Sequence, residues 1–135
     1  MKLKQIMAKI ENDEFGADDL EDYLKGIVEF GNSNDEVQEE CEDIGDKIFL
    51  FKAEELDPFW LKIKEGKLYS GKGEIEDPNS TYILSADALI GILTGKLNGT
   101  ILYTRGELQI KGSLEDGGSL VSLLEILREE MEDAF

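Results

Sequence analysis

Residues 80–112 constrain the fold of this chain most, because they contain a strand, a helix and a second strand with clear boundary signals. Residues 81–84 are mostly β-branched, aromatic or aliphatic, which is typical of a half-buried strand. Ser85 is placed to cap a following helix, and Gly95 is placed to end it. From Leu108 onward apolar and polar residues alternate, as in a strand with one solvent-facing side. The segment therefore predicts a sheet with a helix inserted between two of its strands.

The residues before this segment extend the strand pattern. Residues 48–51 form a continuous apolar run, which indicates a strand covered on both faces. Residues 59–63 and 67–71 predict a hairpin that turns at Glu65 and Gly66. Together these patterns predict an α+β fold with about five strands, mainly antiparallel, covered on one face by helices.

Three helical patterns precede the sheet. The first has an apolar face formed by Leu3, Ile6, Met7 and Ile10. The second and third begin with capping-box patterns, Asp18 with Glu21 and Ser33 with Glu36. We expect the first helix to dock on the core, and the alternative is transient contact of residues 1–10 with a membrane.

A final helix follows Gly117 and Gly118, and we expect these two glycines to precede it and to permit adjustment of its angle. Its apolar surface is wider than one stripe. That excess could meet the sheet and a neighbouring helix, another subunit or a bound lipid. We expect one domain over residues 1–135, with a helical part at 1–46, the sheet at 47–112 and the C-terminal helix at 113–135.

Charge and composition exclude several classes of function. The net charge is −17, with 6 basic and 18 acidic residues up to residue 57, 7 and 6 from residue 58 to 112, and 1 and 7 thereafter. Such a surface repels phosphate backbones and is a poor match for an anionic bilayer. We therefore expect no nucleic-acid partner.

Catalytic and metal-binding chemistry is poorly represented in the composition. The chain has no histidine, and its single cysteine, Cys41, lies on an apolar helical stripe where we expect it to be buried. No cysteine or histidine cluster suits zinc, and no acidic segment has the spacing of a calcium loop. With no leader or long apolar run in the sequence, we expect a cytoplasmic protein. Because the chain has no histidine and its cysteine is expected to be buried, we also expect that it is not an enzyme and has no cofactor.

Two motifs of the organising segment resemble the sterol carrier protein 2 family. These are ILTGKL at residues 92–97 and GELQIKG at residues 106–112, separated without an insertion. The family motifs are an apolar helix that ends in Leu-x-x-Gly-Lys-Leu and a strand of the form Gly-x-Leu-x-Ile-x-Gly. The chain departs from the family at Asn98-Gly99, where many members have Asn-Pro or Asp-Pro.

The resemblance implies an α+β fold in which the helices leave an apolar cavity against the sheet, and an intracellular protein that binds or transfers a sterol, fatty acyl chain or similar molecule without catalysis. The residues supply apolar side chains to line such a cavity, and two tyrosines that could hydrogen-bond a headgroup. The candidate ligand-binding residues are Phe49, Phe51, Phe59, Leu61, Tyr82, Leu84, Leu89, Leu93, Leu102, Tyr103, Leu108, Leu124 and Leu127. The alternative is an interaction module that uses the apolar surface of the last helix to form a homodimer or to bind a protein acceptor.

Overall fold

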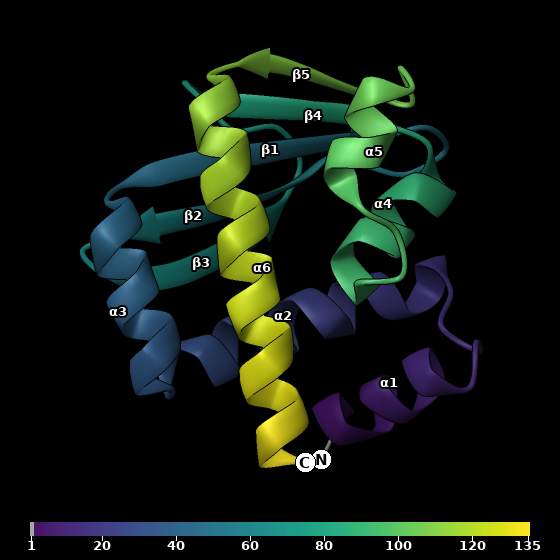
Figure 1. Cartoon of the computed structure of the whole chain (residues 1–135), viewed down its shortest axis with the longest axis vertical. Coiled ribbons are helices and arrows are strands. Elements are labelled where there is room, and N and C mark those ends of the chain that lie inside the picture. Colours follow the sequence, from purple (N-terminus) through teal and green to yellow (C-terminus); the bar gives the residue numbers. More distant parts are fainter. Residues whose placement is uncertain (1) are drawn as a thin grey trace.

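The computed structural model describes residues 2–135, which form a five-stranded sheet and a set of helices packed on one of its faces (Figure 1). The strands are β1 (Lys47–Ala53), β2 (Phe59–Lys64), β3 (Lys67–Lys72), β4 (Ser80–Leu84) and β5 (Leu108–Gly112). The α-helices are α1 (Lys2–Glu11), α2 (Leu20–Asn32), α3 (Asp35–Ile44), α4 (Ala86–Thr94), α5 (Gly99–Thr104) and α6 (Leu114–Ala134), and a 3₁₀ turn spans Ala17–Asp19.

The strands lie in the order β3-β2-β1-β4-β5. Only β1 and β4 run parallel to each other, and the other neighbouring pairs are antiparallel. The prediction of an α+β fold with a mainly antiparallel sheet is therefore confirmed. The predicted hairpin is also present, because β2 and β3 pair on either side of Glu65 and Gly66, which both have positive φ angles.

The strand register places large side chains next to one another on the helix-covered face. Phe51 of β1 pairs with Phe59 of β2 on one side and with Tyr82 of β4 on the other. The ring of Phe51 stacks on both neighbours, with centroids 4.8 Å from Phe59 and 5.2 Å from Tyr82. These aromatic rings form the floor on which the helices pack.

The outer face of β1 carries Ile48 and Leu50, of which Ile48 is partly buried and Leu50 is buried, although helices cover only the other face. Leu50 points away from the helix-covered core, yet it is only 4% exposed. Its cross-strand partner on this outer face is Trp60, whose ring lies beside Lys62 with the ammonium 5.5 Å from the ring centroid. The expected covering of both faces is thus supplied on the outer face by strand neighbours rather than by a second layer.

Two of the predicted helix starts are wrong. Helix α3 is capped by Asn34, whose Oδ1 accepts a hydrogen bond from the backbone N–H of Val37 at 3.0 Å, and Ser33 lies one residue before the cap. Asp18 lies inside the 3₁₀ turn, and α2 begins two residues later. At α3, the Asn34 side chain rather than Ser33 reaches the free N–H groups and sets the boundary, whereas α2 continues from the 3₁₀ turn without a side-chain cap.

Helix α6 begins earlier than expected. Ser113 caps it by accepting a hydrogen bond from the N–H of Asp116 at 3.2 Å, and Gly117 and Gly118 lie inside the helix instead of before it. Glu115 and Asp116 in the first turn interact favourably with the helix dipole. Cap and charges together outweigh the poor helix propensity of the two glycines.

Helix α1 packs on α2 with its apolar face. Leu3 and Ile6 are buried, and a Cβ added at Gly26 of α2 would lie 2.9 Å from Leu3 Cδ1, so the two helices approach closely. The expected docking of this helix on the core is therefore observed. Membrane contact by residues 1–10 stays a prediction, and Met1 lies outside the described residues.

Candidate functional site

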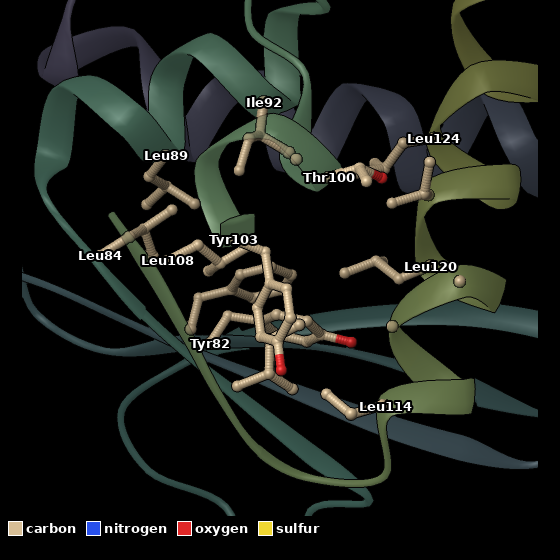
Figure 2. A pocket seen from close by; sticks show the side chains of 16 residues that line it. Tyr82, Leu84, Leu89, Ile92, Thr100, Tyr103, Leu108, Leu114, Leu120 and Leu124 are labelled. Carbon is tan, nitrogen blue, oxygen red and sulfur yellow. The ribbon is translucent and has the colours of Figure 1, made fainter. Parts of the chain in front are cut away.

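A pocket of about 330 Å³ lies between α4, α5 and α6 and the strands β1, β4 and β5 (Figure 2). Its wall is almost entirely apolar. The lining residues are Phe51, Tyr82, Leu84, Leu89, Ile92, Gly99, Thr100, Tyr103, Leu108, Ile110, Leu114, Gly117, Gly118, Leu120, Val121 and Leu124. Pockets of this volume with few polar groups are typical sites for small molecules.

Helix α4 supplies one wall through well-defined ends. Ser85 Oγ accepts a hydrogen bond from the N–H of Ala88 at 3.1 Å, and Gly95 ends the helix in the left-handed conformation at φ 82°. The predicted cap and stop are therefore both confirmed. This fixed length places Leu89 and Ile92 over the sheet at the edge of the pocket.

Helix α5 forms the roof, and the sequence motifs did not indicate it. Asn98 caps it, because its Oδ1 accepts a hydrogen bond from the N–H of Ile101 at 3.1 Å. Asparagine thus starts this helix without the proline that many family members have next. Thr100 and Tyr103 face the pocket from α5, while Leu102 anchors the helix in the core.

The first turns of α6 lie close to the sheet because they carry glycine. A Cβ added at Gly117 would lie 3.4 Å from Ile110 Cδ1 and 3.8 Å from the Tyr82 oxygen. Gly118 faces open space, with nothing within 4 Å of an added Cβ. The two glycines therefore leave volume where side chains would otherwise fill the pocket.

The polar groups of the pocket are three hydroxyls. Ser80 Oγ donates a hydrogen bond to the Tyr82 oxygen at 2.8 Å, and burial raises the pKa of Tyr82 to about 12. Tyr103 is 44% exposed, and Thr100 lies at the opposite side of the hollow near Leu124 (Figure 2). The Tyr82 phenol is neutral at physiological pH and remains a hydrogen-bonding group.

The structure brings part of the predicted ligand-binding set together. Seven of its members line the pocket: Phe51, Tyr82, Leu84, Leu89, Tyr103, Leu108 and Leu124. The other members lie in the hydrophobic core away from it: Phe49, Phe59, Leu61, Leu93, Leu102 and Leu127. Ligand binding by any of them stays a prediction.

Further lining residues were not selected from the sequence. Ile110 shares its strand face with Leu108, and Leu120 and Val121 share a helix face with Leu124, so periodicity already placed them beside chosen residues. Gly117 and Gly118 could not be found in this way, because a glycine contributes to a pocket through the side chain it lacks.

A second hollow of about 490 Å³ lies between the start of α2 and strands β2 and β3. It is larger, but its wall includes five charged residues: Asp18, Glu21, Lys25, Asp57 and Lys72. Lys72 and Lys25 both pair with Glu21, at 2.9 and 3.2 Å. We favour the smaller pocket as the candidate site, since its wall is apolar and faces the core of the sheet.

The described residues contain neither a reactive thiol nor a cluster of metal ligands. Cys41 is 1% exposed, and burial raises the pKa of its thiol to about 11, so the thiol is protonated at neutral pH. Within residues 2–135 no group of three or more acidic or cysteine side chains is arranged to hold a metal ion. None of the helices described is both long and apolar enough to cross a membrane.

The chain belongs to the SCP-2 sterol transfer family, whose model matches residues 24–125. This match includes all the strands of the sheet, α4, α5 and the pocket-lining part of α6. No curated protein sequence matches the chain.

Solved structures share the fold at low sequence identity. The UbiJ-SCP2 ubiquinone synthesis protein is 17% identical over 81% of this chain and 88% of that chain, with a TM-score of 0.63. The sterol carrier protein domain 2 of Helicoverpa armigera is 22% identical over 78% and 85%, with a TM-score of 0.64. The sec-alkylsulfatase Pisa1 from Pseudomonas sp. is 19% identical over 64% of this chain and 14% of that chain, with a TM-score of 0.57. The fold therefore occurs both as nearly a whole chain and as a small part of a larger enzyme.

Proposed function

We propose that this protein binds and carries a lipid or another elongated hydrophobic molecule in the pocket between α4, α5, α6 and the sheet, without catalysing a reaction. The observation that carries the proposal is a pocket of about 330 Å³ whose wall is apolar apart from three hydroxyl groups. Membership of a sterol transfer family supports the same function.

Burial of the ligand would supply the affinity. Each methylene moved from water into an apolar site contributes roughly 0.8 kcal/mol, so a chain of about a dozen carbons binds with few polar contacts. The stacked rings of Phe51 and Tyr82 and the leucines of β4, α4 and α6 provide the surface for these contacts. Specific polar recognition then needs only one or two hydrogen bonds.

Exchange of the ligand would require α5 to move. Helix α5 has six residues, and Leu102 is its buried member, whereas α6 buries Leu123, Leu127 and Met131 in the core. A short helix with a single anchor opens at lower cost than a long, deeply packed one. Adjustment of the angle of α6, which its two glycines would permit, is the alternative route, and the packing favours α5.

An interaction module built on α6 has less support. Leu124 and Leu127 are 3% and 1% exposed, so their side chains are already covered within the chain. The exposed apolar side chains near the pocket belong to α5 and the first turn of α6, at Ile101, Tyr103 and Leu114. A dimer or a protein acceptor stays a prediction that light scattering can check.

The test is lipid extraction and native mass spectrometry of freshly purified protein, followed by uptake of a dodecyl-chain probe. Val121 lines the pocket and is half-buried, so Val121→Trp should fill the hollow and reduce probe uptake by about tenfold or more. Glu129→Trp places the same side chain on an exposed part of the same helix and should bind as the wild type does. A protein that yields no lipid and takes up no probe would refute the proposal.

A further inference from the structure

The chemistry of the pocket wall indicates which class of lipid it selects. We propose that the pocket prefers an uncharged lipid with one oxygen-bearing end, such as an alcohol, ester or ketone, over a fatty acid anion. This inference rests on the proposed function. Its basis is that the 16 lining residues include three hydroxyls and no charged side chain.

An ionised carboxylate would find no cation in this wall and would have only hydroxyl donors to meet its charge. Transfer of a charge from water into an apolar site is unfavourable unless a cation or several hydrogen-bond donors meet it. Lys47 is a cation close to this end of α6, and it already pairs with Asp116, with Nζ 3.1 Å from the carboxylate. Asp116 is itself only 5% exposed and lies within the first turn of α6, one residue before Gly117 of the pocket wall.

The positive end of the α6 dipole is the feature of the wall that favours an anion. Its first turn already carries Glu115 and Asp116, and Ser113 accepts the hydrogen bond of the Asp116 N–H. These groups offset the dipole before a ligand arrives. An anionic headgroup at this end would therefore meet two fixed carboxylates on the same turn.

Arg128 is the basic residue of α6, and it lies on the C-terminal side of the residues that line the pocket. It lines a neighbouring groove that shares five lining residues with the pocket, and a Cβ added at Gly95 would lie 2.5 Å from its Nε. The guanidinium therefore lies against the C-terminal end of α4, where it interacts favourably with the helix dipole. Arg128 is four residues from Leu124, which lines both the pocket and this groove, and four residues span about 6 Å along a helix axis.

Two of the three hydroxyls, those of Tyr82 and Tyr103, lie at the end of the pocket away from Arg128, whereas Thr100 also lines the groove next to Arg128. Figure 2 shows both phenol oxygens on the side of Leu114, with Leu84 and Leu89 at the far side. Because Ser80 donates to the Tyr82 oxygen, the phenol proton of Tyr82 remains for an acceptor on the ligand. A neutral hydroxyl or carbonyl oxygen meets this requirement.

The volume limits the length of the ligand. A cavity of about 150 Å³ holds one benzene, so by proportion a pocket of about 330 Å³ holds about 13 carbon atoms. A larger lipid would have to leave part of its structure outside, past the exposed Tyr103 and Leu114. A dodecyl chain is therefore the suitable probe.

The experiment compares 1-dodecanol with dodecanoate by displacement of a fluorescent neutral probe at pH 7.5, where the acid is ionised. We expect dodecanol to bind at least about tenfold more tightly. If dodecanoate binds equally or better, the inference is overturned and the proposed function stands. If neither ligand binds, the proposed function fails, and this inference fails with it.

Leu114→Lys tests the charge argument directly. Leu114 is 56% exposed, so a lysine there should be tolerated and should place a cation beside the phenols. The affinity for dodecanoate should then rise at least about fivefold relative to the affinity of the same variant for dodecanol. The control is Tyr69→Lys at an exposed position on β3, which should change neither affinity.

A variant at Arg128 identifies the competing explanation. If the wild type prefers dodecanoate and Arg128→Gln removes that preference, the anion is held in the neighbouring groove and the inference is wrong. If Leu114→Lys leaves dodecanoate binding unchanged in a folded protein, the headgroup does not lie at the phenol end, which also contradicts the inference.

Discussion

Gly45 and Gly118 have similarly open surroundings and different backbone conformations. An added Cβ meets nothing within 4 Å at either position, but Gly45 has φ 83° and ψ −174°, whereas Gly118 is helical. Gly118→Ala should raise the free energy of unfolding by about 0.5–1 kcal/mol, because alanine is the better helix former. Gly45→Ala should lower it by about 1–3 kcal/mol, because its conformation suits glycine almost alone.

Urea unfolding of the ligand-free variants checks this pair. Because the surroundings of both glycines are equally open, the two variants should differ only through backbone conformation. Equal changes in the free energy of unfolding, in the same direction, would contradict this explanation. The result also separates stability from binding, since Gly118 lines the pocket and Gly45 does not.

The buried phenols of Tyr23 and Tyr82 make the free energy of unfolding depend on pH in the alkaline range. Burial raises the pKa of each phenol from 10.0 to about 12. Between these values the unfolded chain releases protons that the folded chain keeps, so stability present below pH 10 falls as pH rises toward 12. The loss is at most about 1.4 kcal/mol per pH unit for each tyrosine.

Urea unfolding between pH 9 and 11.5 measures this slope. Tyr23→Phe loses a hydrogen bond to the carbonyl oxygen of Leu93 and should be less stable at every pH, but its stability should fall less steeply. A variant whose curve is as steep as that of the wild type would contradict the assignment.

At the scale of elements, α5 should control ligand exchange. Asn98→Ala removes the cap of α5, which should increase amide hydrogen exchange over residues 99–104 and speed ligand release several-fold. Asn34→Ala removes the same kind of cap from α3, away from the pocket. It should lower overall stability by about 1 kcal/mol and leave exchange in α5 unchanged.

Hydrogen exchange by mass spectrometry, with stopped-flow release of the probe, distinguishes these variants. If Asn98→Ala releases ligand at the wild-type rate while residues 99–104 exchange faster, α5 is not the element that opens. Movement of α6 would then be the remaining route.

The sequence predicted elements with strong periodicity or clear boundary residues. The helix between Ser85 and Gly95 and the hairpin at Glu65 and Gly66 are present as expected. Helix α5 was missed because six residues are too few to show an apolar period, and its start depends on one asparagine side chain. The length of α6 was also underestimated, because its cap, Ser113, precedes Gly117 and Gly118 and lies before the apolar residues that indicated the helix.

The candidate site was predictable only as a set of apolar side chains. Leu124 and Leu127 are both buried on α6, yet Leu124 lines the pocket and Leu127 packs in the core. Periodicity gives the inward direction of a side chain but not whether another side chain meets it there. That difference depends on glycines at 117 and 118 and on the position of α5.

At the scale of the whole molecule, the net charge of −17 should govern contact with bilayers. We expect transfer of a fluorescent lipid to anionic vesicles to be several-fold slower than transfer to zwitterionic vesicles at low salt. Added salt should reduce the difference because it screens the repulsion. Faster transfer to anionic vesicles would point to a local basic contact that overrides the net charge.

Methyl NMR during a titration with 1-dodecanol shows whether the hollow under α5 receives the ligand. We expect large changes in methyl chemical shift for the pocket leucines Leu84, Leu89, Leu120 and Leu124. The methyl shifts of Leu61 and Leu127 in the core should be nearly unchanged. Shifts confined to leucines outside this pocket, or no shifts at saturating probe, would contradict it.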